Sequence, residues 1–229
     1  MRRIRELISI IKEEHPTDHF FANIETTWET SREDRAQYAA YDRALRRLDI
    51  NSWVEIKTKA TRHFLDHRKG QLKQGFFNQL NEAFAYEYLA RKGCTDIKII
   101  KETGETIPDI AYKFNWISAN CEVKTIGISE EQLARWDSIQ AFSGTLYSQL
   151  SDGFLDKLCS TLSSAQSQIA SQGIDGLIYL IVLFDDFTLT YYKKYREQIL
   201  NAIQTHEAPN IYVKIGLLGQ RRIKKGSHA

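Results

Sequence analysis

The stretch P108-D-I-A-Y-K-F-N-W-I-S-A-N-C-E-V-K124 has the pattern of two β-strands joined by a tight turn. A two-residue loop at Asn115 and Trp116 would make it an antiparallel hairpin. In that register one face of the hairpin is apolar and the other is polar, and a slip of one residue would mix the two sets. Asp109 then lies directly opposite Glu122 on the polar face.

Lys124 shares this polar face, because side chains alternate along a strand and Lys124 stands two residues beyond Glu122. Opposed carboxylates repel each other, and a divalent cation removes that repulsion. Magnesium is usually held by one or two carboxylates together with substrate phosphate. A bound metal acidifies water and stabilises charge on a phosphate, and a nearby lysine can position the attacking water. The cluster therefore predicts phosphodiester hydrolysis.

Pro108-Asp109 followed by Glu122-Val123-Lys124 resembles the PD-(D/E)XK signature of the restriction-endonuclease-like nucleases. That superfamily includes restriction enzymes, archaeal Holliday junction resolvases and repair exonucleases. The resemblance implies a DNA endonuclease of restriction or repair type that depends on Mg²⁺, with Mn²⁺ as a substitute. It implies that Asp109, Glu122 and Lys124 are catalytic, and that Asp109, Glu122 and the backbone carbonyl of Val123 hold the metal. DNA is the implied partner, and many relatives act as homodimers.

Four further positions are candidates through the same resemblance. Glu82, on a helix expected over 76–92, resembles the acidic residue on the first core helix of the resolvases, which can complete the metal site. Glu87 is a rival for that role, and a surface glutamate paired with Lys or Arg is the alternative interpretation. Gln166 and Gln168 lie on a helix expected over 151–171, where some of these nucleases place a glutamine near the site. An exposed polar helix face is the alternative for both.

Net charge is only +2, which by itself does not indicate a nucleic-acid ligand. Basic residues nevertheless cluster locally, and such clusters can contact phosphates. Lys73, from the second of these clusters, is a substrate-binding candidate. Solvated helix faces and a charged tail are the alternative interpretation. The clusters are Arg43, Arg46 and Arg47; Arg62, Arg68, Lys69 and Lys73; and Arg221, Arg222, Lys224 and Lys225.

The expected order of elements from Phe76 onward is α-β-β-β-α-β-α-β, which predicts an α/β fold with a mixed sheet flanked by helices. Its first six elements resemble the restriction-endonuclease-like core, and the last two form a C-terminal α-β addition. We expect this core over 71–229 and a helical extension over 1–70. Beyond the hairpin, the expected elements are strand 97–101, helix 151–171, strand 177–184, helix 189–204 and strand 211–217.

Within the helical extension, Ile4, Leu7, Ile8 and Ile11 recur at helical spacing and predict a first helix that ends before Pro16. Thr30 or Ser31 could cap a second helix, and Ser52 and Glu55 have the spacing of a capping box that opens a third. Glu55 and Lys57 also form a second Glu-x-Lys, but residues two apart point in different directions on a helix. His63 and His67, four residues apart, would share one helix face and could ligate a metal. No metalloprotease pattern surrounds them, so an ordinary polar face is the favoured interpretation.

Composition sets broad limits on these hypotheses. Hydrophobic residues at 42% and charged residues at 26% are typical of a soluble globular protein. The longest apolar run, Gly176–Phe184, is strand-sized and too short to span a membrane. The basic N-terminus lacks the apolar region of a signal peptide, so a cytoplasmic location without a membrane partner is expected. Three widely spaced cysteines suggest neither a disulfide framework nor a zinc cluster.

Three alternatives to the nuclease hypothesis remain open on the sequence. The Asp, Glu and Lys of the hairpin could be the charged solvent face of an ordinary pair of strands. The fold could be nuclease-like while the protein only binds nucleic acid. The chain could also be a regulatory interaction protein whose helical extension over 1–70 forms the partner surface.

Overall fold

The computed structural model describes residues 1–67, 72–127, 148–184, 190–218 and 221–227. In these ranges the chain forms an α/β fold with seven helices and a six-stranded mixed sheet in the order β1-β2-β3-β4-β5-β6. The expected α/β class is therefore confirmed. No helix in the ranges that the structure describes has both the length and the apolar character needed to cross a membrane. Packing divides the chain into two units, Met1–Glu105 with Asp109–Ile117, and Thr106–Pro108 with Ser118–Ala229.

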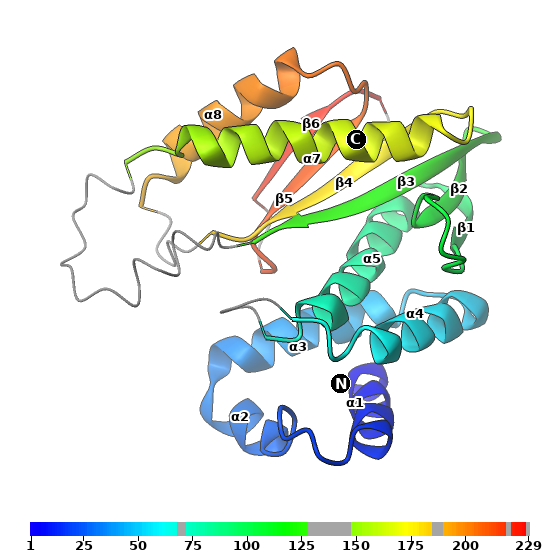
Figure 1. The fold of residues 1–229 in the computed structure, drawn as a ribbon, viewed down its shortest axis with the longest axis vertical. Helices are drawn as coiled ribbons and strands as arrows, with labels where there is room; N and C mark the ends of the chain where they lie inside the picture. Colours follow the sequence, from blue (N-terminus) through cyan, green and yellow to red (C-terminus); the bar gives the residue numbers. More distant parts are fainter. Residues whose placement is uncertain (68–71, 128–147, 185–189, 219–220, 228–229) are drawn as a thin grey trace. The chain divides into compact units, whose positions relative to one another are not determined.

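Five helices of the first unit form its helical layer (Figure 1). The predicted first helix is confirmed: Ile4, Leu7, Ile8 and Ile11 are buried, and the helix ends before Pro16. Ser31 caps the third helix by accepting a hydrogen bond from the Asp34 amide, one of the two caps expected there. The helices are α1 (Arg2–Glu14), α2 (Ile24–Thr30), α3 (Arg32–Leu45), α4 (Ile50–Arg62) and α5 (Gln74–Arg91).

Aromatic side chains hold α5 to the helical layer. Phe76, at the start of α5, is fully buried between Phe21 and Phe64, with ring centroids 5.5 and 5.7 Å away. Both rings meet Phe76 in edge-on arrangements, which the aromatic quadrupole favours. Further along α5, Phe84 packs 5.0 Å from Tyr41 of α3. These contacts account for the apolar stripe read in the sequence of α5.

The beginning and end of α4 differ from the sequence prediction. Asp49, not Ser52, is the N-cap, because the Asp49 carboxylate accepts the hydrogen bond from the Ser52 amide. The Ser52 hydroxyl instead accepts from the amide of Ile99 and ties α4 to a strand. The helix ends at Arg62, so His63 and His67 do not share a helix face, and that prediction is wrong.

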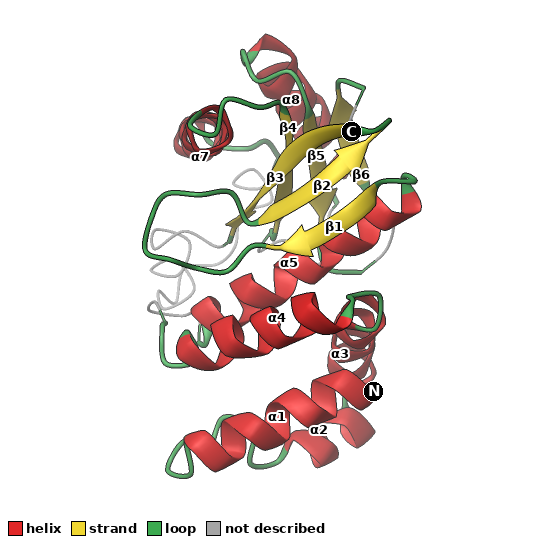
Figure 2. Ribbon diagram, turned by 90° about the vertical axis from the view of Figure 1, so that its right-hand side faces the viewer, coloured by secondary structure: helices red, strands yellow, loops and turns green. Residues whose placement is uncertain are grey.

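Strands β1 (Thr95–Ile99) and β2 (Ile110–Phe114) form an antiparallel pair in the first unit (Figure 2). The register shifts between Thr95 and Lys98, which marks a β-bulge. After β2, the predicted two-residue turn is confirmed: Asn115 and Trp116 separate β2 from β3 (Ile117–Ile126), and both have a positive φ.

The second unit packs helices α7 (Asp152–Ala170) and α8 (Tyr192–Thr205) against its strands. Strand β3 pairs in parallel with β4 (Gly176–Val182), and β4 pairs in parallel with β5 (Ile211–Ile215). Every residue of β4 is buried, as predicted for a strand covered on both faces. Both helices contribute to one core with alternate residues of β4 and β5, so they cover the same face of these strands.

The last strand was not predicted. Residues Arg222–Lys225 form β6, which pairs antiparallel with β5 at the end of the sheet. This segment appears in the sequence as part of a basic cluster, yet Ile223 within it is buried in the core of the second unit. A lone apolar residue among four basic ones gives too short a pattern to indicate a strand. The short helix α2 was also not predicted.

Candidate active site

The hairpin residues singled out in the sequence fall on both units. Asp109 lies directly before β2 in the first unit, where its backbone carbonyl accepts a hydrogen bond from the Ile100 amide over 2.8 Å. Glu122, Val123 and Lys124 lie in the middle of β3 in the second unit. The register in which Asp109 faces Glu122 stays a prediction from the sequence.

Lys124 and Glu122 form a close ion pair on β3. The Lys124 ammonium lies 2.5 Å from Oε1 of Glu122, whose residue is only 1% exposed. The two residues stand two apart on the strand, so they share a face, as predicted. A carboxylate this deeply buried requires a charged or hydrogen-bonding partner, because its loss of hydration is costly. Lys124 supplies this partner and itself keeps partial access to solvent.

Gln168 of α7 is a second hydrogen-bond partner of Lys124. The Lys124 ammonium donates a hydrogen bond to Oε1 of Gln168 over 2.6 Å. The ammonium is therefore fixed between a carboxylate on β3 and an amide on α7. Gln166 is half-buried on the same helix, but residues two apart point in different directions. Of the two glutamine candidates, the structure brings Gln168 to Lys124.

Gly176, the first residue of β4, permits this approach of helix to strand. A Cβ at Gly176 would stand 2.2 Å from the carbonyl oxygen of Asn120 on β3 and 2.8 Å from Cγ2 of Ile169 on α7. Glycine is thus required where Ile169 of α7 packs against the start of β4. Ile169 directly follows Gln168 in the chain. The missing side chain at Gly176 therefore helps to place Gln168 beside Lys124.

Glu82 is buried within the first unit rather than on its surface. The side chain extends from α5 and accepts hydrogen bonds from the Lys59 ammonium of α4. Glu87, the rival candidate, pairs with Arg91 one turn later on α5, over 2.7 Å. Each glutamate therefore has a basic partner in the first unit.

Lys73 is also buried, at the N-terminal end of α5. Its ammonium is ion-paired with Asp18 and stands 3.9 Å from the ring centroid of Phe64. The residue has a φ of 58°, in the left-handed region. The structure gives Lys73 a role in anchoring the segment before α5. Its assignment to substrate binding stays a prediction.

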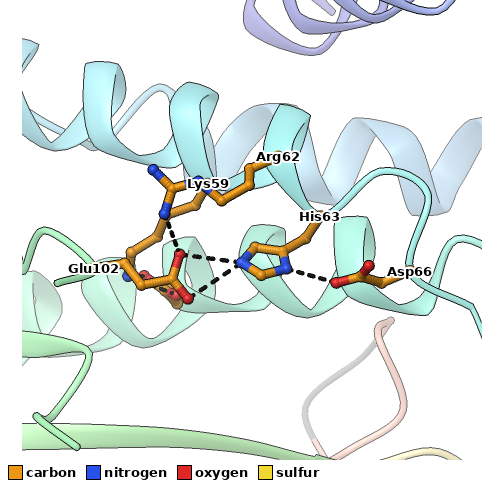
Figure 3. Close-up of polar contacts among 6 residues, drawn as sticks. Lys59, Arg62, His63, Asp66 and Glu102 are labelled. Carbon is orange, nitrogen blue, oxygen red and sulfur yellow. Dashed lines mark hydrogen bonds and ion pairs between the residues drawn. The ribbon is translucent and has the colours of Figure 1, made fainter. Parts of the chain in front are cut away.

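A polar network that was not predicted from the sequence surrounds His63 (Figure 3). Nδ1 of His63 lies 2.6 Å from Asp66, and Nε2 lies 3.1 and 3.2 Å from the two oxygens of Glu102. Arg62 donates to Glu102 over 2.8 Å. The spacing of Asp66 from His63 is visible in the sequence, but Glu102 comes from the segment after β1 and could be found only by folding.

Protonation of His63 is favoured in this network. Partial burial disfavours the charged imidazolium, but the hydrogen bonds and negative charges of Asp66 and Glu102 outweigh that effect and raise the pKa of His63 above its usual value. For Glu102, burial acts to raise the pKa, while His63 and Arg62 outweigh it and lower the pKa. The network therefore ties the end of α4 to the segment after β1 most strongly when His63 is charged.

The donor set on β3 suits a hard cation. The Glu122 carboxylate and the Val123 carbonyl are oxygen ligands, which Mg²⁺ and Mn²⁺ prefer. Among the residues that the structure describes, no group of three or more His, Cys, Asp and Glu side chains is gathered as a metal-ligand set. The predicted site has only two such side chains, Asp109 and Glu122, because its third ligand is the backbone carbonyl of Val123. It therefore does not count as a group of three.

Comparison of the chain with protein-family models, with curated proteins and with solved structures found no match.

Proposed function

We propose that this protein is a metal-dependent deoxyribonuclease with a restriction-endonuclease-like core, which hydrolyses phosphodiester bonds in DNA. The observation that carries the proposal is the position of Lys124, held between the Glu122 carboxylate and the Gln168 amide. A lysine fixed at two points is pre-organised to orient a reacting group without the entropy cost of ordering a free side chain.

Each residue of the proposed site has a role that follows from its chemistry. Lys124 orients the attacking water or the scissile phosphate and stabilises the negative charge that develops there. Glu122, Asp109 and the Val123 carbonyl supply oxygen ligands for Mg²⁺ or Mn²⁺. When bound, the metal acidifies water and neutralises charge on the phosphate. Gln168 keeps the Lys124 ammonium in place and so acts as a positioning residue.

The order of elements supports the proposed core. The helix α5 precedes β1, β2 and β3, and α7 then leads to β4, which is the α-β-β-β-α-β order of the nuclease superfamily. Asp109 stands at the start of the second strand and the Glu-x-Lys lies within the third, as the signature requires. The parallel pairing of β3 with β4 is the arrangement expected when a helix connects two neighbouring strands.

DNA as the substrate is supported by a basic surface on the second unit. Arg221, directly before β6, lies over the ring of Tyr192 at the start of α8, 5.1 Å from its centroid, and three basic side chains of α8 are exposed nearby. Such a surface can neutralise several phosphates of a DNA backbone. We call it the α8–β6 basic surface; it comprises Lys193, Lys194, Arg196 and Arg221. Arg222 and Lys224 alternate with the buried Ile223 and so belong to the other face of the sheet.

The test is cleavage of linear duplex, supercoiled circle, single strand and four-way junction DNA with Mg²⁺, with Mn²⁺ and with chelator. Wild type is compared with Asp109→Ala, Lys124→Ala and the control Lys57→Ala. The control removes the lysine of the second Glu-x-Lys, which lies on α4 and pairs with Glu6. We expect metal-dependent cleavage that Asp109→Ala and Lys124→Ala abolish and Lys57→Ala retains. Equal cleavage by wild type and both site variants would exclude the proposed site.

If no DNA is cleaved but wild type and Lys124→Ala bind it equally, the protein is a nucleic-acid-binding module. The proposed hydrolysis would then be wrong. A steep fall of DNA affinity with salt concentration would show that contacts with phosphates carry this binding, because each neutralised phosphate releases counterions.

A further inference from the structure

The tip of the β2–β3 hairpin exposes an aromatic side chain on a strained backbone. Asn115 and Trp116 have φ values of 49° and 70°, both in the left-handed region. Trp116 is 88% exposed, and the neighbouring Ile117 is 67% exposed. A large apolar side chain thus stands in water at a position that disfavours any side chain.

Two-residue hairpin turns with positive φ at both positions strongly favour Asn-Gly. Asn115 fits the first position, since asparagine tolerates left-handed φ. Trp116 occupies the second position, where glycine has no steric penalty and tryptophan does. Strained residues of this kind persist where they serve a function. A glycine at position 116 would remove both the backbone strain and the exposed apolar surface. The presence of a tryptophan there therefore requires an explanation.

Basic side chains lie along the strands and helix end that lead to this tip in the first unit. Thr95 pairs with Lys113, so the start of β1 lies beside the end of β2 that leads into the turn. Helix α5 ends at Arg91, shortly before β1, and therefore also at this end of the hairpin. Lys98 pairs with Ala111 and shares the face of Lys113. The charged side chains here are Arg91, Lys92, Lys98 and Lys113, against Glu87 and Asp96. Arg91 is ion-paired with Glu87 and Lys113 with Asp96, each over 2.7 Å, so the net excess is two basic side chains.

We propose that Trp116 stacks on an unpaired base of DNA while the basic side chains around the tip attract the adjacent phosphates. Stacking on aromatic side chains combined with a positive surface is the usual way in which proteins bind single-stranded nucleic acid, and it tolerates any base. The tight turn holds the indole away from the strands, where a splayed base can reach it. Trp116 thereby selects DNA with a single-stranded or frayed segment.

This inference rests on the proposed function for its ligand, DNA, but does not require cleavage. A lipid surface or a second copy of the chain could also take up an exposed tryptophan. A second copy of the chain would bring like charges together at the tip, whereas anionic lipid headgroups carry phosphates as DNA does. We infer DNA as the occupant because it is the substrate of the proposed function, and binding to lipid vesicles is an outcome of the test.

The experiment measures binding of a fluorescent 20-nucleotide single strand and of the matching duplex by anisotropy, in chelator so that no cleavage occurs. The variants are Trp116→Gly, Trp116→Leu and Trp116→Tyr, with Ile50→Ala as control. Ile50 is an exposed apolar residue on α4 of the same unit. Stacking is worth about 1–3 kcal/mol per base, so Trp116→Gly should weaken single-strand binding about fivefold or more.

We expect Trp116→Leu to lose as much affinity as Trp116→Gly, because leucine keeps apolar bulk but has no π-face. Trp116→Tyr should retain most of the affinity, and Ile50→Ala all of it. A 2-aminopurine in the single strand should be quenched by wild type and not by Trp116→Leu. The melting temperature of Trp116→Gly should equal or exceed that of wild type, which separates lost binding from lost folding.

The inference is overturned if Trp116→Gly binds the single strand as tightly as wild type. It is also overturned if Trp116→Leu keeps the affinity, if duplex binding falls equally, or if wild type binds no DNA. Two results would assign the tip to another partner if DNA binding is unchanged in Trp116→Gly. Loss of vesicle binding in this variant would assign the tip to an anionic lipid surface, and loss of concentration-dependent dimerisation would assign it to a second copy of the chain. Cleavage lost in Lys124→Ala tests the nuclease separately, so either proposal can fail alone.

Discussion

Lys59 donates hydrogen bonds to both carboxylate oxygens of Glu82, over 3.1 and 3.0 Å, and the two side chains are only 7% and 5% exposed. The pair joins α4 to α5 in the first unit. Because the charge of Glu82 is already balanced by Lys59, a metal at Glu82 would have to compete with this ion pair. The role of Glu82 as an additional metal ligand stays a prediction.

Removing one partner of this pair should destabilise the protein strongly. Lys59→Met leaves the Glu82 carboxylate buried without its counter-charge, which costs about 3–5 kcal/mol. The double variant Lys59→Met with Glu82→Leu should recover most of that loss, since two apolar side chains need no partner. Urea unfolding followed by circular dichroism measures both values.

The control for this prediction is the exposed ion pair of Arg62 with Glu102. Arg62→Met should cost about 0–1 kcal/mol, because solvent screens an exposed pair. Equal effects of Lys59→Met and Arg62→Met would show that burial does not strengthen the Lys59–Glu82 interaction.

Gln168→Leu should reduce DNA cleavage without unfolding the protein. The substitution removes the amide that holds the Lys124 ammonium, and loss of such a supporting hydrogen bond costs about 10–100-fold in activity at comparable sites. The reduction should appear in kcat more than in KM, since Lys124 acts on the reacting group. Gln166→Leu, on the same helix, should retain cleavage within a few-fold. The role of Gln168 would be refuted by equal cleavage rates in the two variants.

Gly176→Ala should destabilise the second unit. Its Cβ would overlap the Asn120 carbonyl oxygen, which is backbone and cannot turn away, and Ile169 of α7. Such overpacking costs about 1–3 kcal/mol. The control is Gly153→Ala in the first turn of α7, where a Cβ meets nothing within 4 Å. Alanine there should raise stability by up to about 1 kcal/mol. Thermal unfolding that ranks the two variants in the opposite order would contradict the packing described here.

Stability should depend on pH through His63. The pKa of His63 is raised in the folded protein above its usual value of 6.5, so the folded state binds the proton more tightly than the unfolded chain does. The resulting stabilisation is complete below about pH 6.5 and disappears as pH rises through the folded pKa. The melting temperature of wild type should therefore exceed that of His63→Asn most clearly near pH 5.5, with a smaller difference at alkaline pH.

Glu102→Gln tests the same interaction by changing the partner of His63. It removes a negative charge from Nε2 of His63 while keeping a hydrogen-bond acceptor, and should reduce the pH dependence of the difference. A difference between wild type and His63→Asn that grows with pH would mean that the folded pKa is lowered instead.

Periodicity in the sequence was sufficient for several elements. Apolar residues at helical spacing predicted α1, the hairpin pattern predicted the turn at Asn115 and Trp116, and the unbroken apolar run predicted the buried strand β4. In each case the signal comes from residues within a few positions of each other, so no distant partner has to be known.

The tertiary structure decided which polar groups meet. Lys59 and Glu82 lie 23 positions apart, His63 and Glu102 lie 39 apart, and Lys124 and Gln168 lie 44 apart. Gln166 and Gln168 were equal candidates in the sequence, and the packing of α7 on the strands brings Gln168 to Lys124. The same packing determines burial, and burial sets the energy of an ion pair. Local patterns in the sequence therefore determined the helices and strands and the residue types of the candidate site. Long-range packing determined which polar side chains pair with each other, because pairing depends on distance and burial in space rather than on separation along the chain.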